Sequence, residues 1–259
     1  MPILLTPFVY SNNFHGNTWE IDNIQLLASH LADVALGQSL HVQKIIQGAQ
    51  FPTPIPTVGA KRGAINLLTV SGADPYHRDG WIFQVMSWLA AIKANPHDIL
   101  RAPQMRHADK GFDGLSLKLN SHTGEIDAAI IFEDKATENP RKTIRSEVWP
   151  GLSSIEKGDK ENVLVAELST LLGSYGVSNA MEAISKIVWN ESCHYRVSVT
   201  VQTIHSTEAG RKRLFSGFNE IVAGDTKRRQ GETIKIPQMR LWMQHLADLA
   251  IADLEARNV

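Results

Sequence analysis

The sequence predicts an α/β protein in which a mixed central β-sheet is flanked by helices. Two runs of strand character, 115–119 and 126–132, are joined by a polar stretch containing Gly124, and this pattern predicts a β-hairpin. A third run, 195–204, alternates and is rich in β-branched residues, so we expect it to join the same sheet. Helical character is found in the segments 79–91, 163–172, 179–189 and 238–256.

The first part of the chain, residues 1–73, is predicted to be an N-terminal extension or subdomain, followed by the main domain over 74–259. Residues 1–17 have the composition of irregular structure, and an apolar stripe over 18–36 predicts a helix. The alternating prolines of 52–56 deny both helical and sheet hydrogen bonds, so they are predicted to form a rigid connection. A division into two domains at this proline run is the alternative.

The segment 79–91 is apolar over most of its helical circumference, which is typical of a deeply buried helix. Asn95-Pro96 is expected to end this helix. The other predicted elements are a strand over 64–70, a polar linker over 151–162, a helix over 206–222 and a short strand over 232–236.

The composition bounds the class of protein. The 259 residues include 43% hydrophobic residues and six Trp, enough for a sizeable core. The net charge of −1 argues against a free-standing, non-specific nucleic-acid binder, although a nuclease can have a basic groove on an otherwise acidic surface. The single cysteine, Cys193, excludes an intramolecular disulfide and is predicted to be a small buried residue. Without a signal peptide or a long apolar stretch, we expect a soluble, cytoplasmic protein with no membrane partner.

Charged residues gather at the open end of the predicted hairpin. Asp113 opens its first strand, and Glu133 and Lys135 close its second, where alternation places them on one face and Asp134 on the other. Antiparallel pairing brings Asp113 beside them. Two carboxylates can hold Mg²⁺ while leaving several of its waters in place, and Lys135 can orient or activate one water for attack on a phosphodiester.

These residues resemble the signature of the PD-(D/E)XK nuclease superfamily, over roughly residues 78–205. The lone acidic residue of that signature matches Asp113, and its Glu-x-Lys triplet matches residues 133–135, whereas Phe112 stands where the family usually has proline. The resemblance implies a restriction-endonuclease-like fold and hydrolysis of DNA with Mg²⁺ or Mn²⁺, more often by an endonuclease than an exonuclease. The implied metal ligands are Asp113, Glu133 and the backbone carbonyl of Asp134.

More loosely, the whole chain resembles the small nucleases of bacterial antiphage systems, such as the Hachiman-type nuclease subunit, which implies a helicase-like or ATPase partner. In the superfamily a helix precedes the catalytic hairpin, and some members place an acidic or amide side chain of that helix near the metal. Gln84 and Asp79 are the candidates for this accessory role. Helix capping is the alternative for Asp79.

Two clusters of cations are candidates for contact with the DNA backbone, which they would hold by charge without reading its sequence. The alternative for each cluster is a solvated face. Further cations at Arg101, Arg106, His107 and Lys110 precede the acidic strand opening. The candidates are Arg141, Lys142 and Arg145 in the first cluster and Arg211, Lys212 and Arg213 in the second.

Two other functions are compatible with the same residues: a non-catalytic subunit that binds nucleic acid or protein, and an RNA-cutting toxin. The chain contains no P-loop, no Gly-x-Gly-x-x-Gly motif and no His-Glu-x-x-His motif, so nucleotide hydrolysis and zinc proteolysis have no support. Because the net charge is near zero, we expect the isolated chain to bind DNA weakly and to cut poorly. The predicted helix over 238–256 is the first candidate for docking a partner, and core packing is its alternative.

Overall fold

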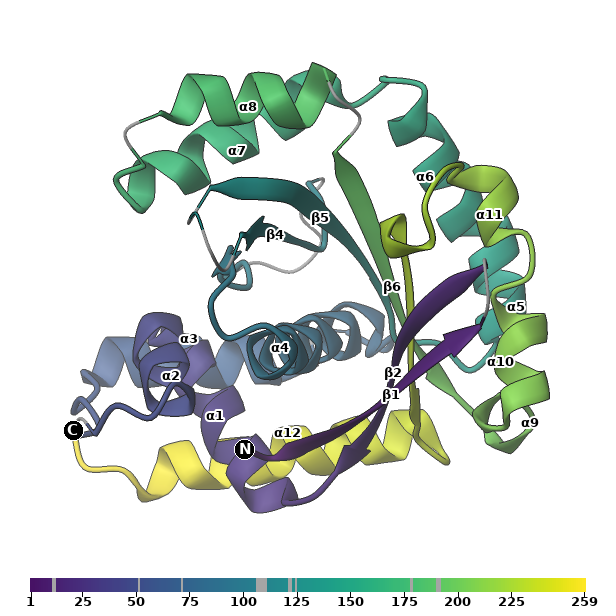
Figure 1. Cartoon of the computed structure of the whole chain (residues 1–259). Coiled ribbons are helices and arrows are strands. Elements are labelled where there is room, and N and C mark those ends of the chain that lie inside the picture. The colour runs from purple at the N-terminus through teal and green to yellow at the C-terminus, as the bar shows by residue number, and fades with distance from the viewer. Residues whose placement is uncertain are drawn as a thin grey trace.

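The computed structural model describes residues 1–10, 13–50, 52–70, 72–105, 111–120, 123, 125–177, 179–189 and 192–259. Within these residues the chain forms one curled, mixed β-sheet in the order β1-β2-β7-β6-β5-β4-β3, with helices on both faces (Figure 1). The predicted α/β class is therefore confirmed. The strands are β1 (Ile3–Tyr10), β2 (Phe14–Ile21), β3 (Ile99–Leu100), β4 (Gly114–Leu119), β5 (Ile126–Lys135), β6 (Cys193–Val201) and β7 (Arg229–Lys235).

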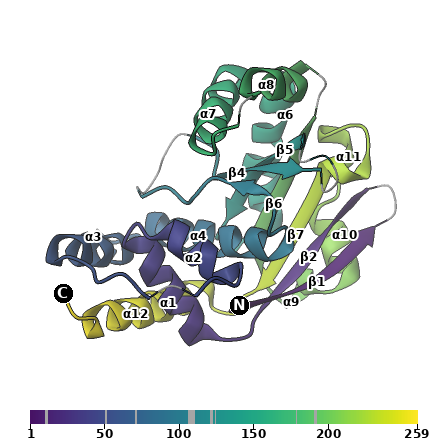
Figure 2. The same cartoon turned by 60° about the vertical axis from the view of Figure 1, so that its left-hand side comes forward.

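Each face of the sheet has its own hydrophobic core. One core is built with α1 (Ile24–Ala35), α2 (Ser39–Ile46), α3 (Val58–Leu68), α4 (Tyr76–Ala94) and α12 (Met239–Ala256). The other is built with the π-helical turn η1 (Ile144–Val148), α6 (Trp149–Glu156), α7 (Glu161–Ser174), α8 (Ala180–Trp189), α10 (Glu208–Leu214) and α11 (Phe218–Ile221). Figure 2 shows α7 and α8 far from α1, α3 and α12, on the opposite side of the sheet. The remaining short elements are α5 (Pro140–Thr143), α9 (Thr203–Ser206) and the 3₁₀ turn η2 (Thr226–Arg228).

The direction of the strands determines where a site can form. Strands β2, β7, β6 and β5 run parallel, whereas β4 pairs with β5 in the antiparallel sense, as the predicted hairpin requires. In an open α/β sheet, ligands bind outside the carboxyl ends of the parallel strands. Here that edge contains the end of β5 and, through the antiparallel pairing, the beginning of β4.

The prediction that residues 1–17 are irregular is wrong, because they contain β1 and the first half of β2. Strand β2 pairs with β7, whose residues lie more than two hundred positions later, so no local pattern reveals this pairing. The two backbones approach closely at Gly16, where an added Cβ would lie 1.8 Å from the carbonyl oxygen of Gly231. The glycine that made this stretch resemble a loop is thus required by the sheet.

Two other local predictions in the first half need correction. The first helix begins at Ile24 and not at residue 18, because Asn23 accepts a hydrogen bond from the backbone N–H of Leu26 at 2.9 Å and caps it. The segment 64–70, predicted as a strand, is instead the last turns of α3 up to Leu68 and the residues that follow it, and Ala64 and Leu68 form the buried face of the helix. Four residues apart, these two lie on one side of a helix, and so short an apolar run suits either structure.

In the second half, the predicted linker over 151–162 begins with α6, which Trp149 and Leu152 anchor in the core. The basic segment after β5, which holds the first cation cluster, is helical through α5 and η1. The predicted helix over 206–222 is interrupted at Gly217, whose φ of 91° is left-handed. Cys193 is half-buried at the start of β6 and not fully buried as predicted.

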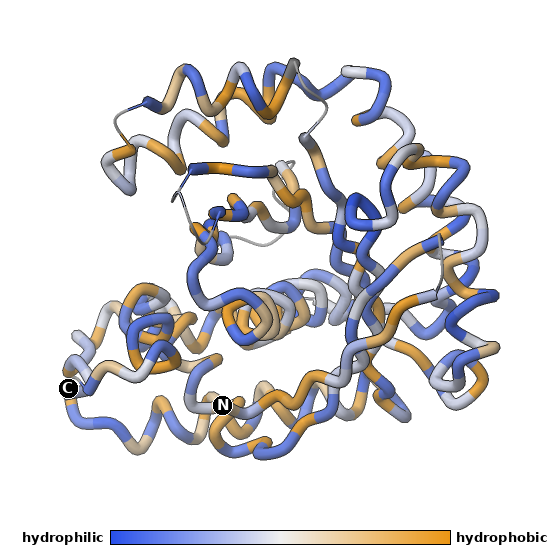
Figure 3. The backbone as a smooth tube through the Cα atoms, viewed as in Figure 1, coloured by the Kyte–Doolittle hydropathy of each residue, from blue (hydrophilic) through white to orange (hydrophobic). Residues whose placement is uncertain are grey.

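The strongly periodic helices are confirmed. Helix α4 is buried nearly all round and is coloured mostly hydrophobic along its second half in Figure 3. Helix α12 packs Met243, Leu246, Ala250 and Leu254 into the same core as α1 and α3. Residues 1–73 therefore share both a sheet and a core with residues 74–259. Among the described residues, no helix is both long and apolar enough to cross a membrane.

Candidate functional site

The open end of the β4–β5 hairpin brings Asp113 next to the end of β5. The register that pairs Gly114 with Phe132 places Asp113 opposite Glu133, one step further along. One carboxylate oxygen of Asp113 accepts the backbone N–H of Asp134 at 2.8 Å, and the other accepts the side-chain amide of Gln84 at 2.7 Å. Asp113 is thus held to both β5 and α4, and Gln84, one of the two accessory candidates, lies beside it.

Gly114 makes this close approach possible. A Cβ at this position would lie 2.6 Å from a ring carbon of Phe132, which is well inside van der Waals contact. The Asp113-Gly114 pair therefore combines the candidate carboxylate with the small residue that lets its strand lie against β5.

Glu133 and Lys135 lie on one face of β5, as alternation predicts, and their side chains form an ion pair of 2.8 Å. Both side chains are about one-fifth exposed, at 22% and 21%. The ammonium of Lys135 also lies 4.0 Å from the carboxylate of Glu147. Glu147 belongs to the π-helical turn η1, a kind of turn that is frequent at functional sites. Glu147 was not among the residues that the sequence predicted for the site.

The electrostatics of this cluster favour an additional cation. Burial, and next the negative charge of Glu133, raise the pKa of Asp113 to about 6, although Lys135 and the two hydrogen bonds oppose the shift. For Lys135, burial lowers the pKa, but Glu133 and Asp113 outweigh it and the pKa is raised, so the ammonium stays charged. Two carboxylates this close repel each other, which makes Asp113 hard to ionise. A cation bound between them would reduce that repulsion.

We expect Asp113→Asn to stabilise the metal-free protein at neutral pH. The unfolded aspartate ionises near pH 4 and the folded one near 6, so the wild-type protein loses stability as the pH rises through that window. Asparagine does not titrate, and the amide of Gln84 can turn to accept its N–H. The variant should gain about 1–3 kcal/mol above pH 6 and nothing below pH 4. Urea denaturation in EDTA across pH 4–8 measures this difference, and a pH-independent difference would contradict it.

The residues present fit a hard divalent cation. Mg²⁺ is commonly held by one or two carboxylates and keeps several waters, and Asp113 and Glu133 supply that number. Among the described residues, no group of three or more His, Cys, Asp and Glu side chains could hold a metal ion. The carboxylate of Asp134 is buried and accepts a hydrogen bond from Ser87, so only the backbone carbonyl of Asp134 is left as a candidate ligand.

A pocket of about 320 Å³ opens beside these groups. Its walls come from the start of α4, the residues just before β4, the end of β5, α5, η1 and α12. Asp113 and Lys135 line it, whereas Glu133, which pairs with Lys135, is not among the described residues that line it. The charged and polar side chains on the walls include Tyr76, His77, Gln84, Thr137, Thr143, Glu147 and Arg240.

Asp79, the second accessory candidate, does not point to Asp113. Its carboxylate is fully buried and forms ion pairs with Arg78 at 2.7 Å and Arg240 at 2.6 Å. Among the described residues it makes no capping hydrogen bond to α4 either. The local sequence could not show this, because Arg240 follows much later in the chain.

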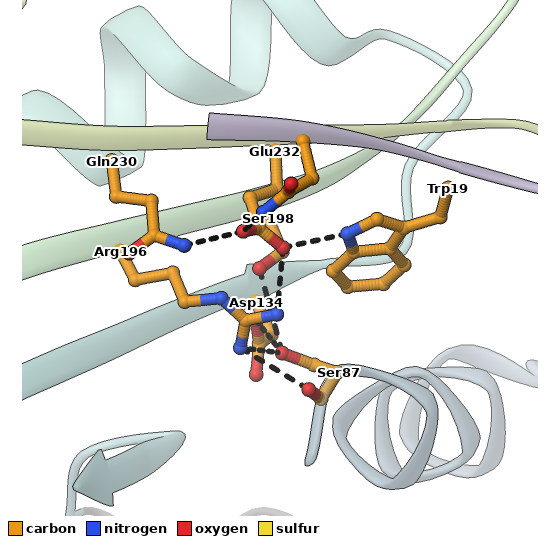
Figure 4. A network of polar contacts seen from close by, with 8 residues as sticks. Trp19, Ser87, Asp134, Arg196, Ser198, Gln230 and Glu232 are labelled. Carbon is orange, nitrogen blue, oxygen red and sulfur yellow. Dashed lines mark hydrogen bonds and ion pairs between the residues drawn. The ribbon is translucent and has the colours of Figure 1, made fainter. Parts of the chain in front are cut away.

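A buried polar network lies directly behind β5 (Figure 4). The hydroxyl of Ser87 donates to the carboxylate of Asp134 at 2.7 Å, and the guanidinium of Arg196 donates to the same hydroxyl at 2.9 Å. Arg196 also pairs with Glu232 at 2.7 Å. Its guanidinium lies over the rings of Trp19, at 5.3 Å, and Phe132, at 4.6 Å.

Glu232 is the best-satisfied charge in this network. Besides Arg196, it accepts hydrogen bonds from Trp19 at 2.6 Å, Asn17 at 2.9 Å and Gln230. Burial opposes its ionisation, yet these partners, Arg196 first, hold its pKa below the usual value. Burial, opposed by Arg196, raises the pKa of Asp134 to about 7. The network therefore anchors the strand whose backbone holds Asp113.

The alternation of residues along β6 is a sequence signal for this network. Along β6, Val197, Val199 and Val201 occupy one face, and the other face carries Arg196, Ser198 and Thr200. A central strand covered on both faces must satisfy every polar side chain internally. Polar residues alternating within such a strand therefore indicate a buried network.

The two predicted basic clusters lie side by side. The guanidinium of Arg141 donates to the carbonyls of Leu214 at 2.8 Å and Ser216 at 3.1 Å, which ties α5 to the end of α10. A shallow pocket of about 510 Å³ lies between them, lined by Arg141, His205, Lys212, Arg213 and Ser216.

Not all of these cations are free for a ligand. Arg211 is bonded to the Tyr10 hydroxyl at 2.9 Å, and Lys212 pairs with Glu208 at 2.7 Å. Lys142, Arg145 and Arg213 are exposed and form no ion pair among the described residues. Arg101 pairs with Glu167, and the candidates Arg106, His107 and Lys110 lie outside the described residues.

No protein-family model matches the chain, and no curated protein or solved structure matches it. Its function must therefore be argued from the site itself.

Proposed function

We propose that this protein hydrolyses DNA phosphodiester bonds with Mg²⁺, or Mn²⁺ as a substitute, as an endonuclease of the PD-(D/E)XK type. The observation that carries the proposal is the convergence of Asp113, Glu133 and Lys135 at the end of β5, beside a pocket that both Asp113 and Lys135 line. The hairpin with parallel β6 beside it and α4 packed behind it is compatible with a restriction-endonuclease-like core.

Each residue has a role that its contacts support. Asp113 and Glu133 would hold the metal with the carbonyl of Asp134, and Gln84 keeps Asp113 in place. When bound, the ion supplies Lewis-acid stabilisation of the phosphate and lowers the pKa of a water. Because its pKa is raised, Lys135 acts as a charged hydrogen-bond donor that orients the water or a phosphate oxygen, and not as a base.

The adjoining basic surface suits the backbone of the same strand of DNA. Helix α5 separates the two pockets, since Thr143 lines the pocket at β5 and Arg141 lines the basic one. Exposed Lys142, Arg145 and Arg213 are the free cations of this surface among the described residues. A role in cytoplasmic antiphage defence with a helicase-like partner rests on the resemblance described above, and the small size of this basic surface is compatible with delivery by a partner.

The purified chain should cut DNA only when a divalent metal is present. Linear, circular and single-stranded DNA, and single-stranded RNA, are incubated with Mg²⁺, Mn²⁺ or EDTA and separated on gels. Cutting of circular DNA identifies an endonuclease, and cutting of RNA alone would identify the toxin-like alternative. Failure to cut any substrate with either metal, at high protein concentration and low salt, would contradict catalysis by the isolated chain.

The second candidate function, a non-catalytic subunit with the same fold, is favoured by one observation: Glu133 is already paired with Lys135 and does not line the pocket. Calorimetric titration with Mn²⁺ separates the two functions. A catalytic site should release heat that Asp113→Asn abolishes, whereas a binding subunit should show none.

A further inference from the structure

Asp79 joins the start of α4 to the start of α12. One carboxylate oxygen accepts two hydrogen bonds from the guanidinium of Arg78, at 3.0 and 2.7 Å. The other accepts one from Arg240 at 2.6 Å. Arg78 also donates to Gln244, one helical turn beyond Arg240. Asp79 and Arg78 are almost completely buried, so this connection is a fixed part of the protein interior.

The same connection leaves a positive charge in the candidate pocket. Two guanidinium groups share one carboxylate, so the three residues together have a net charge of one positive. Arg78 is buried, whereas the side chain of Arg240 is 32% exposed and lines the pocket at β5. Asp79 occupies one of its amino groups, and among the described residues Arg240 has no second hydrogen-bond partner. The remaining N–H groups of its guanidinium are free for a ligand.

The backbone before Arg240 is also unusual. Gln238 has a φ of 48°, and among the described residues it is the one non-glycine residue with a positive φ. It occupies the position that caps α12, without a capping hydrogen bond from its own side chain. Backbone strain of this kind persists where the surrounding structure needs it. Here it lies two residues before the arginine that enters the pocket.

We infer that Arg240 binds a phosphate group of the substrate in this pocket, and that buried Asp79 positions it. The inference rests on the proposed function, since it concerns the phosphodiester strand that the nuclease site would cut. A guanidinium matches phosphate oxygens with a planar fork of N–H donors and remains charged at all relevant pH values. Arg240 and Lys135 are the two cationic side chains among the described residues that line the pocket. They come from different elements, so a phosphate between them would be held from two sides.

Binding to a short, dye-labelled single-stranded oligonucleotide tests the inference without cleavage. Every protein carries Asp113→Asn and is measured in EDTA, which prevents cutting and removes one carboxylate that would repel a phosphate. The variants are Arg240→Gln, which removes the charge, and Arg240→Lys, which keeps it. The matched control is Arg62→Gln, the same change at an exposed position of α3 away from the pocket.

Arg240→Gln should weaken binding roughly tenfold at low salt and lower the slope of log K against log salt by about 0.7, the loss of one phosphate contact on a single strand. Arg240→Lys should keep the slope but bind several-fold more weakly, because the fork is lost. Arg62→Gln should change neither quantity. A purely structural role of Arg240 would lower the melting temperature and leave the salt slope unchanged.

The outcomes separate this inference from the proposed function. If the oligonucleotide binds and Arg240→Gln keeps the reference slope, Arg240 only fastens α12 to α4; the inference fails and the nuclease proposal stands. If the oligonucleotide does not bind, but pyrophosphate raises the melting temperature of the reference protein and not of Arg240→Gln, the phosphate site stands, and the cleavage assay alone decides the nuclease proposal. If neither probe binds, the inference fails whatever the cleavage assay shows. Should Arg240→Gln not fold, Arg240→Lys decides, and affinity equal to the reference overturns the inference.

Discussion

Lys135→Ala and Glu133→Ala should each lose at least about a hundredfold of the DNA-cleavage rate, the scale of removing one preorganised electrostatic partner. Glu133 would contribute one of two carboxylates to the metal, and it also fixes Lys135 through the 2.8 Å ion pair. Lys135 would contribute the charged donor beside the scissile phosphate. Because each residue also orients the other, the double variant should lose little more than either single one.

Single-turnover cleavage of DNA with saturating Mg²⁺ measures this loss directly. Lys44→Ala is the matched control, since Lys44 is exposed on α2, remote from the pocket. Its rate should equal that of the wild type. Urea denaturation of the same samples shows whether a variant is folded. Wild-type rates in both Lys135→Ala and Glu133→Ala would refute the assignment of the site.

Glu232→Gln should destabilise the protein by about 3–5 kcal/mol, the usual cost of removing one partner of a buried ion pair. The substitution preserves size and shape, so the loss measures the charge and not the packing. The guanidinium of Arg196 would remain buried without its ion-pair partner, although the Ser87 hydroxyl, two aromatic rings and the carboxylate of Asp134 stay near it. A loss of this size is a large fraction of the 5–15 kcal/mol typical of a folded domain.

Urea denaturation at pH 7 measures the effect, which should appear as a lower midpoint with an unchanged slope. Glu208→Gln breaks the exposed pair with Lys212 and serves as the control, for which we expect no measurable change. A Glu232→Gln midpoint equal to that of the wild type would show that Arg196 is satisfied without its partner.

The same variant should respond to pH in the opposite sense to Asp113→Asn. The pKa of Glu232 is lowered in the folded protein, so its stabilisation is present above its unfolded pKa of about 4.3 and is lost as the pH falls further. The difference between the wild type and Glu232→Gln should therefore shrink below pH 4. The gain from Asp113→Asn instead develops as the pH rises above 4.

Local patterns in the sequence were enough for the parts of the fold that have their own periodicity. The β4–β5 hairpin, helix α4 and helix α12 were predicted because their side chains alternate, or are apolar, over segments long enough to leave one interpretation. The same hairpin pattern predicted that Asp113 lies beside Glu133 and Lys135, because antiparallel register follows from two neighbouring strands. Proximity of Gln84 to Asp113 followed from the resemblance, not from periodicity.

Only the tertiary structure decided which residues far apart in the sequence pair with one another. The sequence predicts an accessory metal role or a helix cap for Asp79. In the structure its carboxylate instead accepts a hydrogen bond from Arg240 of α12, 161 positions later. Residues 1–17, predicted to be irregular, form β1 and the first half of β2, which pairs with β7. Glu232 on β7 is satisfied by Trp19, which is 213 positions away. Buried polar groups and central strands must find partners wherever the folded chain provides them, and periodicity along the chain has no information about residues so far apart.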